Sequence, residues 1–150
     1  MTAIRRYRPG DLRSLLRVEE ESFGPRERYG PEVFLALISL PGSVILVAEE
    51  DGEVVGYSAG YLEGDGVGHI ASVAVRPGFR RRGIGRALME ALERELVARG
   101  ARRLRLEVRA SNQAARRLYE SLGYRVVRRL PGYYRDENGL LMEKAVSQEP

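Results

Sequence analysis

The sequence contains no cysteine, and only one of its residues, His69, is a histidine. Without cysteine the chain can form no disulfide, use no thiol nucleophile and offer no thiolate to a metal ion. A lone histidine cannot build a histidine-rich metal site either. We therefore expect no metal, and a chemistry that needs neither a metal nor a protein thiol.

Long apolar runs are also missing. No run of about 18 or more apolar residues occurs, so no segment is expected to cross a membrane. The first residues, 1–6, lack the apolar core of a secretory signal. These absences favour a cytoplasmic protein without a membrane partner.

The composition is that of an ordinary globular protein, with 43% apolar and 31% charged residues among 150. This length suits a single domain, 1–150, with its own core. The net charge is +4, and its cations are nearly all arginine, since Lys144 is the only lysine. Such a surface could serve nucleic acid, a polyphosphate or solubility. No RNA-binding motif with interleaved aromatics appears, so we expect no direct nucleic-acid partner. We expect the protein to be a monomer or a weak dimer.

Hydrophobic periodicity and turn residues predict an alternating order of strands and helices. In chain order these are strand 2–8, helices 11–23 (Asp11 as N-cap) and 31–40, strands 44–48, 53–62 and one ending at Val75, helix 84–99, strand 103–109, helix 112–122, and strands 124–130 and 140–146. Asp51-Gly52 predicts a hairpin, so the three strands around it should be antiparallel neighbours. The strand–helix–strand unit that follows should be parallel and right-handed.

The centre of this unit is the turn 80–86, Arg-Arg-Arg-Gly-Ile-Gly-Arg, between the strand ending at Val75 and an amphipathic helix. The first amides of a helix have no internal partner, and the positive end of its dipole favours an anion. Arginine side chains strengthen such a site. The alternative is a basic turn that only connects two elements.

Two known phosphate-binding patterns do not fit this turn. No Lys-Ser or Lys-Thr follows the glycines, and Leu88 stands where a dinucleotide-binding loop has its third glycine. The spacing that remains, Arg80-x-x-Gly83-x-Gly85, resembles the acyl-coenzyme A pyrophosphate loop of the GNAT superfamily of N-acetyltransferases. The resemblance implies an α/β fold whose mixed, mostly antiparallel sheet splays apart between two parallel strands, with acetyl-CoA in the opening. It implies coenzyme contacts from Arg80, Arg81, Arg82, Gly83, Ile84, Gly85 and Arg86, and from the backbone of Val73, Ala74 and Val75.

A second segment, 106–124, contains LEVRASN and LYESLGY and resembles the RimI-type branch of the same superfamily, which acetylates protein N-terminal α-amines. The resemblance implies that Glu107 is the general base, that Tyr119 is the general acid at the coenzyme sulfur, and that Asn112 contacts the coenzyme. Taken alone, Glu107 could equally form a surface ion pair with a neighbouring arginine, and Tyr119 could be a core aromatic.

The acceptor groove is expected between two loops, 23–29 and 131–139. Tyr133-Tyr134 resembles a paired-tyrosine feature of N-terminal acetyltransferases, and with Tyr29 it is expected to hold the acceptor peptide. The acidic-Ala pair that usually follows the two tyrosines is missing, and packing at a strand end is the alternative role for them. We interpret His69 as a solvated or hydrogen-bonding strand residue.

The acceptor that these features favour is a protein N-terminus, a ribosomal protein being one case. An α-amine with a pKa of about 8 is partly neutral at pH 7, whereas a lysine at about 10.4 is rarely so. Two other functions stay open: acetylation of a small-molecule amine, and a module that only binds coenzyme A or an anion.

Overall fold

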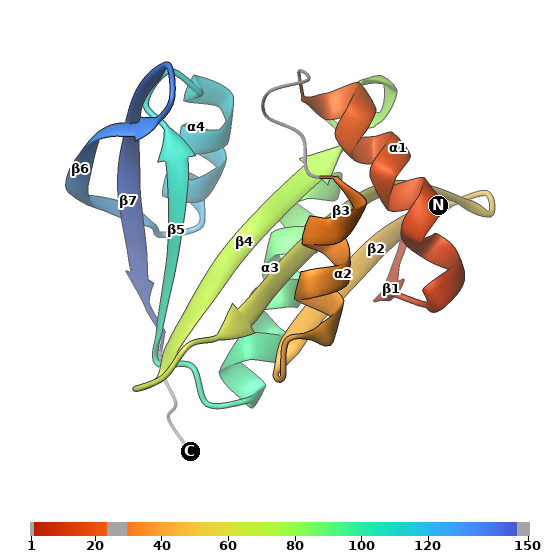
Figure 1. Cartoon of the computed structure of the whole chain (residues 1–150), viewed down its shortest axis with the longest axis horizontal. Helices are drawn as coiled ribbons and strands as arrows, with labels where there is room; N and C mark the ends of the chain where they lie inside the picture. Colours follow the sequence, from red (N-terminus) through yellow and green to blue (C-terminus); the bar gives the residue numbers. More distant parts are fainter. Residues whose placement is uncertain (1, 24–29, 147–150) are drawn as a thin grey trace.

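The computed structural model describes residues 2–23 and 30–146. Its strands form one seven-stranded sheet in the order β1-β2-β3-β4-β5-β7-β6 (Figure 1). The strands are β1 (Thr2–Arg6), β2 (Ser43–Glu50), β3 (Glu53–Leu62), β4 (Val67–Val75), β5 (Arg103–Arg109), β6 (Arg125–Tyr134) and β7 (Glu137–Ala145). The helices are α1 (Leu12–Ser22), α2 (Pro31–Ser39), α3 (Ile84–Ala98) and α4 (Gln113–Ser121). The predicted order of elements and the predicted fold class are confirmed.

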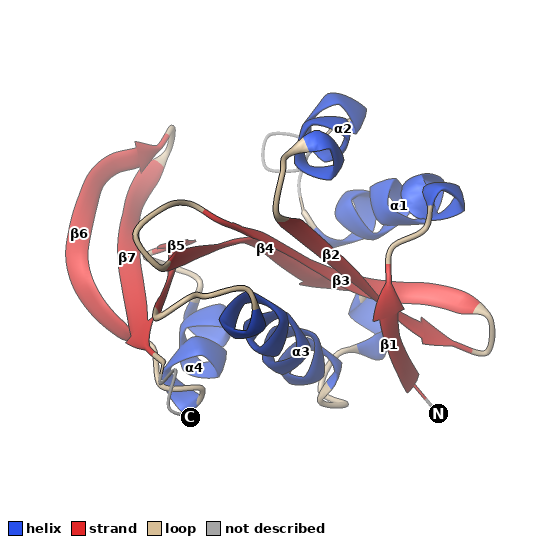
Figure 2. Cartoon of the chain, turned by 90° about the horizontal axis from the view of Figure 1, so that it is seen from below, coloured by secondary structure: helices blue, strands red, loops and turns tan. Residues whose placement is uncertain are grey.

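The helices cover both faces of the sheet, with α1 and α2 on one side and α3 and α4 on the other (Figure 2). Each side has its own buried cluster. Leu88, Leu92 and Leu96 of α3 pack on one face, and Leu15 and Val18 of α1 pack on the other. Among the described residues, no helix is long and apolar enough to cross a membrane.

Local sequence explains most of the connections. Asp51 and Gly52 both have positive φ (51° and 79°), as the predicted tight hairpin requires. Asp11 differs from the prediction, because its carboxylate does not cap α1. It accepts the Arg8 N–H at 2.7 Å and pairs with the Arg5 guanidinium at 2.9 Å. The charge of Arg5 therefore holds this carboxylate on the turn before the helix.

The parallel strands β4 and β5 pair over only three positions, from Val67↔Arg103 to His69↔Arg105. Beyond them the strands diverge, as Figure 1 shows. β5 stays paired with β7 along all of its length, whereas β4 stays with β3. Among the described residues, no strand pairs with this edge of β4 from Ile70 to Val75, which we call its open edge. The splayed sheet implied by the sequence resemblance is present.

The hairpin formed by β6 and β7 corrects one expectation. Residues 131–139 were expected to be a loop, but both strands continue to a short turn at Arg135 and Asp136. The register shifts between Leu130 and Tyr134, where Pro131 and Gly132 interrupt the pairing. β6 is an edge strand, and an edge strand with an irregular register tolerates proline.

Candidate active site

A cleft of about 320 Å³ opens where β4 and β5 diverge. Its lining comes from α1 (Glu19, Phe23), β4 (Ile70, Ala71, Ser72, Val73), β5 (Leu106, Glu107, Val108, Arg109), α4 and its cap (Asn112, Ala115, Tyr119), and Tyr134. Residues more than 100 positions apart in the sequence thus share one cavity.

The N-terminus of α3 has the geometry of an anion site. Gly83 takes the N-cap position with φ 79°, a left-handed conformation that glycine adopts at little cost. No side chain of residues 2–23 or 30–146 caps this helix end. In the described part of the chain, the first backbone hydrogen bond at this end is the one from Ala87 N–H to the Gly83 carbonyl, and the amides before it have no partner there, so they can bind a ligand.

The four arginines of the turn have different surroundings. Arg80 donates from Nε to the Val75 carbonyl at 3.0 Å, and Arg86 donates to the Ser121 hydroxyl at 2.9 Å. Arg82 pairs with the buried carboxylate of Glu50 at 2.6 Å, so it holds the turn against β2. Arg81, with φ 62°, has no partner among the described residues.

The open edge of β4 presents its backbone groups in alternation. Arg76 N–H bonds to the Val55 carbonyl, and Ala74 stands opposite Tyr57 with the same parity. Ala74 therefore directs its N–H and carbonyl toward β3, whereas Val73 and Val75 direct theirs to the open edge. Of the three residues whose backbone was expected to contact the coenzyme, Ala74 is thus the one whose N–H and carbonyl face away from the open edge.

Glu107 on β5 reaches the cleft and is held there by two neighbours. Its carboxylate lies 2.7 Å from His69 Nε2 and accepts a hydrogen bond from Arg105 at 2.6 Å. His69 Nδ1 lies 2.8 Å from the hydroxyl of Tyr61. Burial acts to raise the pKa of Glu107, but the hydrogen bond from His69 and the charge of Arg105 outweigh it, and the pKa is lowered. Glu107 therefore forms the ion pair with a neighbouring arginine and also lines the cleft.

Tyr119 on α4 lines the same cleft. Its ring packs edge-on against Tyr124, with centroids 6.1 Å apart. Burial raises the pKa of Tyr119 to about 12, so its phenol keeps its proton at neutral pH. Within the described part of the chain, its hydroxyl has no hydrogen-bond partner. Both the core-aromatic role and the donor role are therefore compatible with its position.

Of the two residues that could cap α4, Ser111 and Asn112, the cap is Asn112, with Oδ1 accepting the Ala115 N–H at 3.1 Å. Its amide nitrogen is left to donate to a ligand in the cleft.

Of the two adjacent tyrosines at the end of β6, which were expected to hold the acceptor, Tyr134 lines the cleft. The Arg109 guanidinium stands 4.4 Å from the Tyr134 ring centroid. Tyr133 is 53% exposed and lines an adjoining pocket with Arg135 and Asp136. Tyr29, the third residue expected here, lies outside the described residues.

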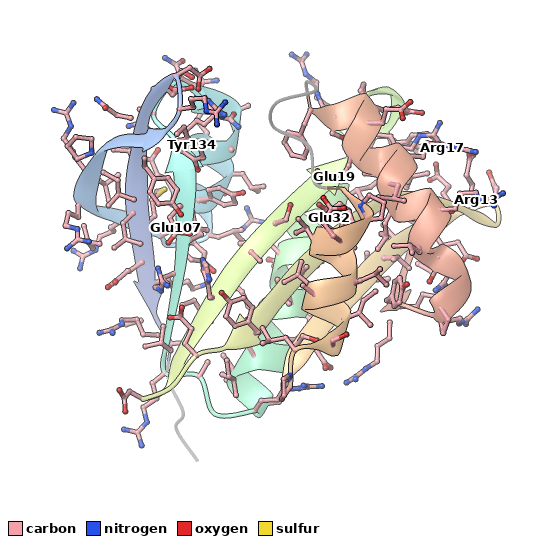
Figure 3. The ribbon with its side chains drawn as sticks, viewed as in Figure 1. Arg13, Arg17, Glu19, Glu32, Glu107 and Tyr134 are labelled. Atoms are coloured by element: carbon pink, nitrogen blue, oxygen red, sulfur yellow. The ribbon has the colours of Figure 1, made fainter. Side chains whose placement is uncertain are left out.

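Sequence reasoning missed a buried polar chain on the wall of this cleft. The Tyr57 hydroxyl donates to the carboxylate of Glu19 and lies 2.8 Å from the Ser72 hydroxyl. Glu19 is 1% exposed, yet it belongs to the apolar face of α1 that contains Leu15 and Val18. The sequence signal that could have revealed this site is a carboxylate on the apolar face of a helix. Figure 3 shows Glu19 on one side of the opening, and Glu107 and Tyr134 on the other.

This architecture, a mixed sheet opened between two parallel strands that are joined by a helix with a glycine N-cap, is the acyl-CoA N-acyltransferase class of fold. The model of the acetyltransferase (GNAT) family matches residues 11–124. The chain belongs to this family.

Individual relatives agree with the family assignment. The chain is 40% identical over 143 residues to an uncharacterised N-acetyltransferase of Methanocaldococcus jannaschii, covering 94% of this chain and 90% of that protein. It is 35% identical over 156 residues to the N-terminal acetyltransferase B complex catalytic subunit of Arabidopsis thaliana, covering 99% and 88%. The structure matches that of the ribosomal-protein-S18-alanine N-acetyltransferase of Escherichia coli with a TM-score of 0.89 at 28% identity, covering 100% and 97%. The protein is therefore an acetyl-CoA-dependent N-acetyltransferase.

Proposed function

We propose that this enzyme moves the acetyl group of acetyl-CoA to the α-amine of a protein N-terminus. The observation that carries the proposal is that the Glu107 carboxylate and the Tyr119 phenol line one cleft, beside the open edge of β4. A base for the incoming amine and an acid for the departing thiolate are the two groups that such a transfer needs.

The coenzyme would be held at two places. Its diphosphate fits the free amides at the start of α3, with Arg80, Arg81 and Arg86 close in sequence to supply positive charge. Its pantetheine arm carries amides that can pair with the backbone of Val73 and with the N–H of Val75, whose carbonyl already accepts from Arg80, as an added strand would. The same N–H groups can polarise the thioester carbonyl.

The reaction would proceed by direct attack while both substrates are bound. The amine nitrogen forms a bond to the acetyl carbon, and its surplus proton passes to Glu107, directly or through a water molecule. The carbon–sulfur bond breaks, and the thiolate receives a proton from Tyr119. The lowered pKa of Glu107 keeps it ionised at neutral pH, and the raised pKa of Tyr119 keeps it protonated, as the two roles require.

Several observations favour an N-terminal α-amine as the acceptor. A base with a lowered pKa is weak, and it suits an amine with a pKa of about 8 better than a lysine at about 10.4. Tyr134 on the acceptor side can contact the first residues of a peptide. Two of the proteins to which the chain is similar are named for N-terminal or ribosomal-protein acetylation, so a ribosomal-protein N-terminus belongs among the test substrates.

The proposal is tested by measuring release of free coenzyme A thiol with purified protein, acetyl-CoA and a panel of peptides. The panel varies the first two residues, includes ribosomal-protein N-termini, and contains Nα-blocked copies with an internal lysine. Turnover of free N-termini, with little of the blocked copies, is the expected result. Turnover of small cationic amines in place of every peptide would contradict it.

A further inference from the structure

The buried chain Glu19–Tyr57–Ser72 is not used by the roles assigned above. Glu19 comes from α1, Tyr57 from β3 and Ser72 from β4, and the three are joined by two hydrogen bonds. Glu19 and Ser72 both line the cleft, whereas Tyr57 is fully buried behind them.

The hydrogen bonds between these three side chains all run in one direction, toward Glu19. Tyr57 has one hydroxyl proton, which it gives to the Glu19 carboxylate. The contact of 2.8 Å between Tyr57 and Ser72 must therefore use the proton of Ser72. With that proton engaged, the Ser72 oxygen has only lone pairs left to offer, and hydrogen bonds that lead on to a carboxylate make this oxygen a stronger acceptor.

Ser72 lies beside an irregularity in the pairing of β4 with β3. The register between β3 and β4 shifts at this point, from Ala59↔Ser72 to Gly60↔Ile70, so Ala71 is an extra residue. Its contact with Tyr57 places the Ser72 side chain on the α1 side of the sheet, since Tyr57 packs in the cluster with Leu15. The next residue, Val73, directs its N–H to the open edge.

We propose that Ser72 is the acceptor-binding residue that receives a hydrogen bond from the substrate amine, and that Glu19 and Tyr57 orient its oxygen for this purpose. The amine arrives as an ammonium with N–H donors only, so it needs acceptors on the cleft wall. Ser72 takes one N–H. The ammonium loses one proton to bulk water before its nitrogen can attack, and Glu107 takes the second proton as the nitrogen–carbon bond forms. The assignment rests on the proposed function, and it concerns the amine nitrogen of the acceptor rather than the coenzyme.

The test is steady-state kinetics of Ser72→Ala and Ser72→Thr, with Ser39→Ala at the exposed end of α2 as the matched control. A hydrogen bond to a charged group is worth enough to raise KM for the peptide by about 10-fold or more when it is removed. KM for acetyl-CoA should change by less than about 2-fold. Ser72→Thr keeps the hydroxyl and should restore most of the peptide affinity, which a purely structural role would not predict.

Tyr57→Phe and Glu19→Gln give a second measurement. Tyr57→Phe breaks the hydrogen-bond chain behind Ser72, whereas Glu19→Gln keeps an acceptor for Tyr57 and removes the negative charge. Each should raise KM for the peptide, provided that thermal unfolding shows a folded protein. An unchanged peptide KM in Ser72→Ala, or a parallel rise in KM for acetyl-CoA, overturns the inference while the wild type still acetylates peptides. If the wild type acetylates only a small amine, the proposed function fails, and the same KM comparison is made with that amine.

Discussion

Replacement of Tyr119 by phenylalanine separates chemistry from structure in this protein. The variant loses one hydroxyl and keeps the ring that packs against Tyr124. Because that hydroxyl has no partner among the described residues, its removal leaves no buried donor or acceptor unpaired. The free energy of unfolding should therefore change by less than about 1 kcal/mol.

The expected loss of rate is much larger. General acid catalysis contributes about 10²- to 10⁴-fold, so kcat should fall by at least about 100-fold, equal to about 2.7 kcal/mol of activation free energy. Thiol release at saturating peptide and acetyl-CoA measures kcat, and calorimetric titration with coenzyme A measures its affinity. The affinity should stay within about 3-fold of the wild type, because the acid acts on the departing sulfur.

Tyr124→Phe is the matched control for this experiment. The Tyr124 hydroxyl is buried and donates to Glu93 at 2.8 Å, so its loss should cost about 1 kcal/mol of stability and leave kcat unchanged. The two variants should thus show opposite patterns. A Tyr119→Phe enzyme with kcat within about 3-fold of the wild type would remove the phenol from the mechanism.

Three further variants test the base, the turn and the core. Glu107→Gln should lower kcat by about 100-fold, with Glu63→Gln, which breaks a different ion pair of Arg105, as the control. The wild-type kcat/KM should rise with pH up to about 8, because the amine loses its proton there while Glu107, with its lowered pKa, is already ionised. It should not fall again until well above pH 9, because the pKa of Tyr119 is about 12. A fall in kcat/KM on the acid side, near pH 7, that disappears in Glu107→Gln would contradict the lowered pKa of Glu107. Gly83→Ala has room for its methyl group but not the right φ, so it should cost about 1–2 kcal/mol in unfolding and raise KM for acetyl-CoA; a normal KM would argue against the anion site. Leu92→Ala, at a fully buried position of α3, should cost about 2–5 kcal/mol and lower Tm by roughly 5–15 °C, and a smaller shift would mean that the core refills the space.

Much of the fold follows from short-range chemistry. The glycines that need positive φ lie at the ends of elements, such as Gly52 in the hairpin and Gly100 after α3. Apolar and charged residues alternate along β5, and its apolar residues Leu104 and Leu106 are buried. These features depend on residues a few positions apart, and periodicity measures that range.

Periodicity failed where a longer-range contact decides the outcome. The β6–β7 hairpin runs past Pro131 because β6 pairs with β7 again at Tyr134↔Glu137, and the carboxylate of Asp11 turns to Arg5 on β1. In both cases a partner from another element outweighed the preference of the local sequence.

The sequence by itself determined the order of the elements, the glycine-containing turn before α3, and the residue types able to donate and accept protons. Only the tertiary structure decided which of these residues meet. The pairing of β4 with β5, which ends at His69↔Arg105, brings Glu107 to His69, and the packing of α1 on β3 and β4 joins Glu19 to Ser72 through Tyr57. Such contacts arise when separate faces bury their apolar side chains together, and no local pattern in the chain encodes which polar groups then become neighbours.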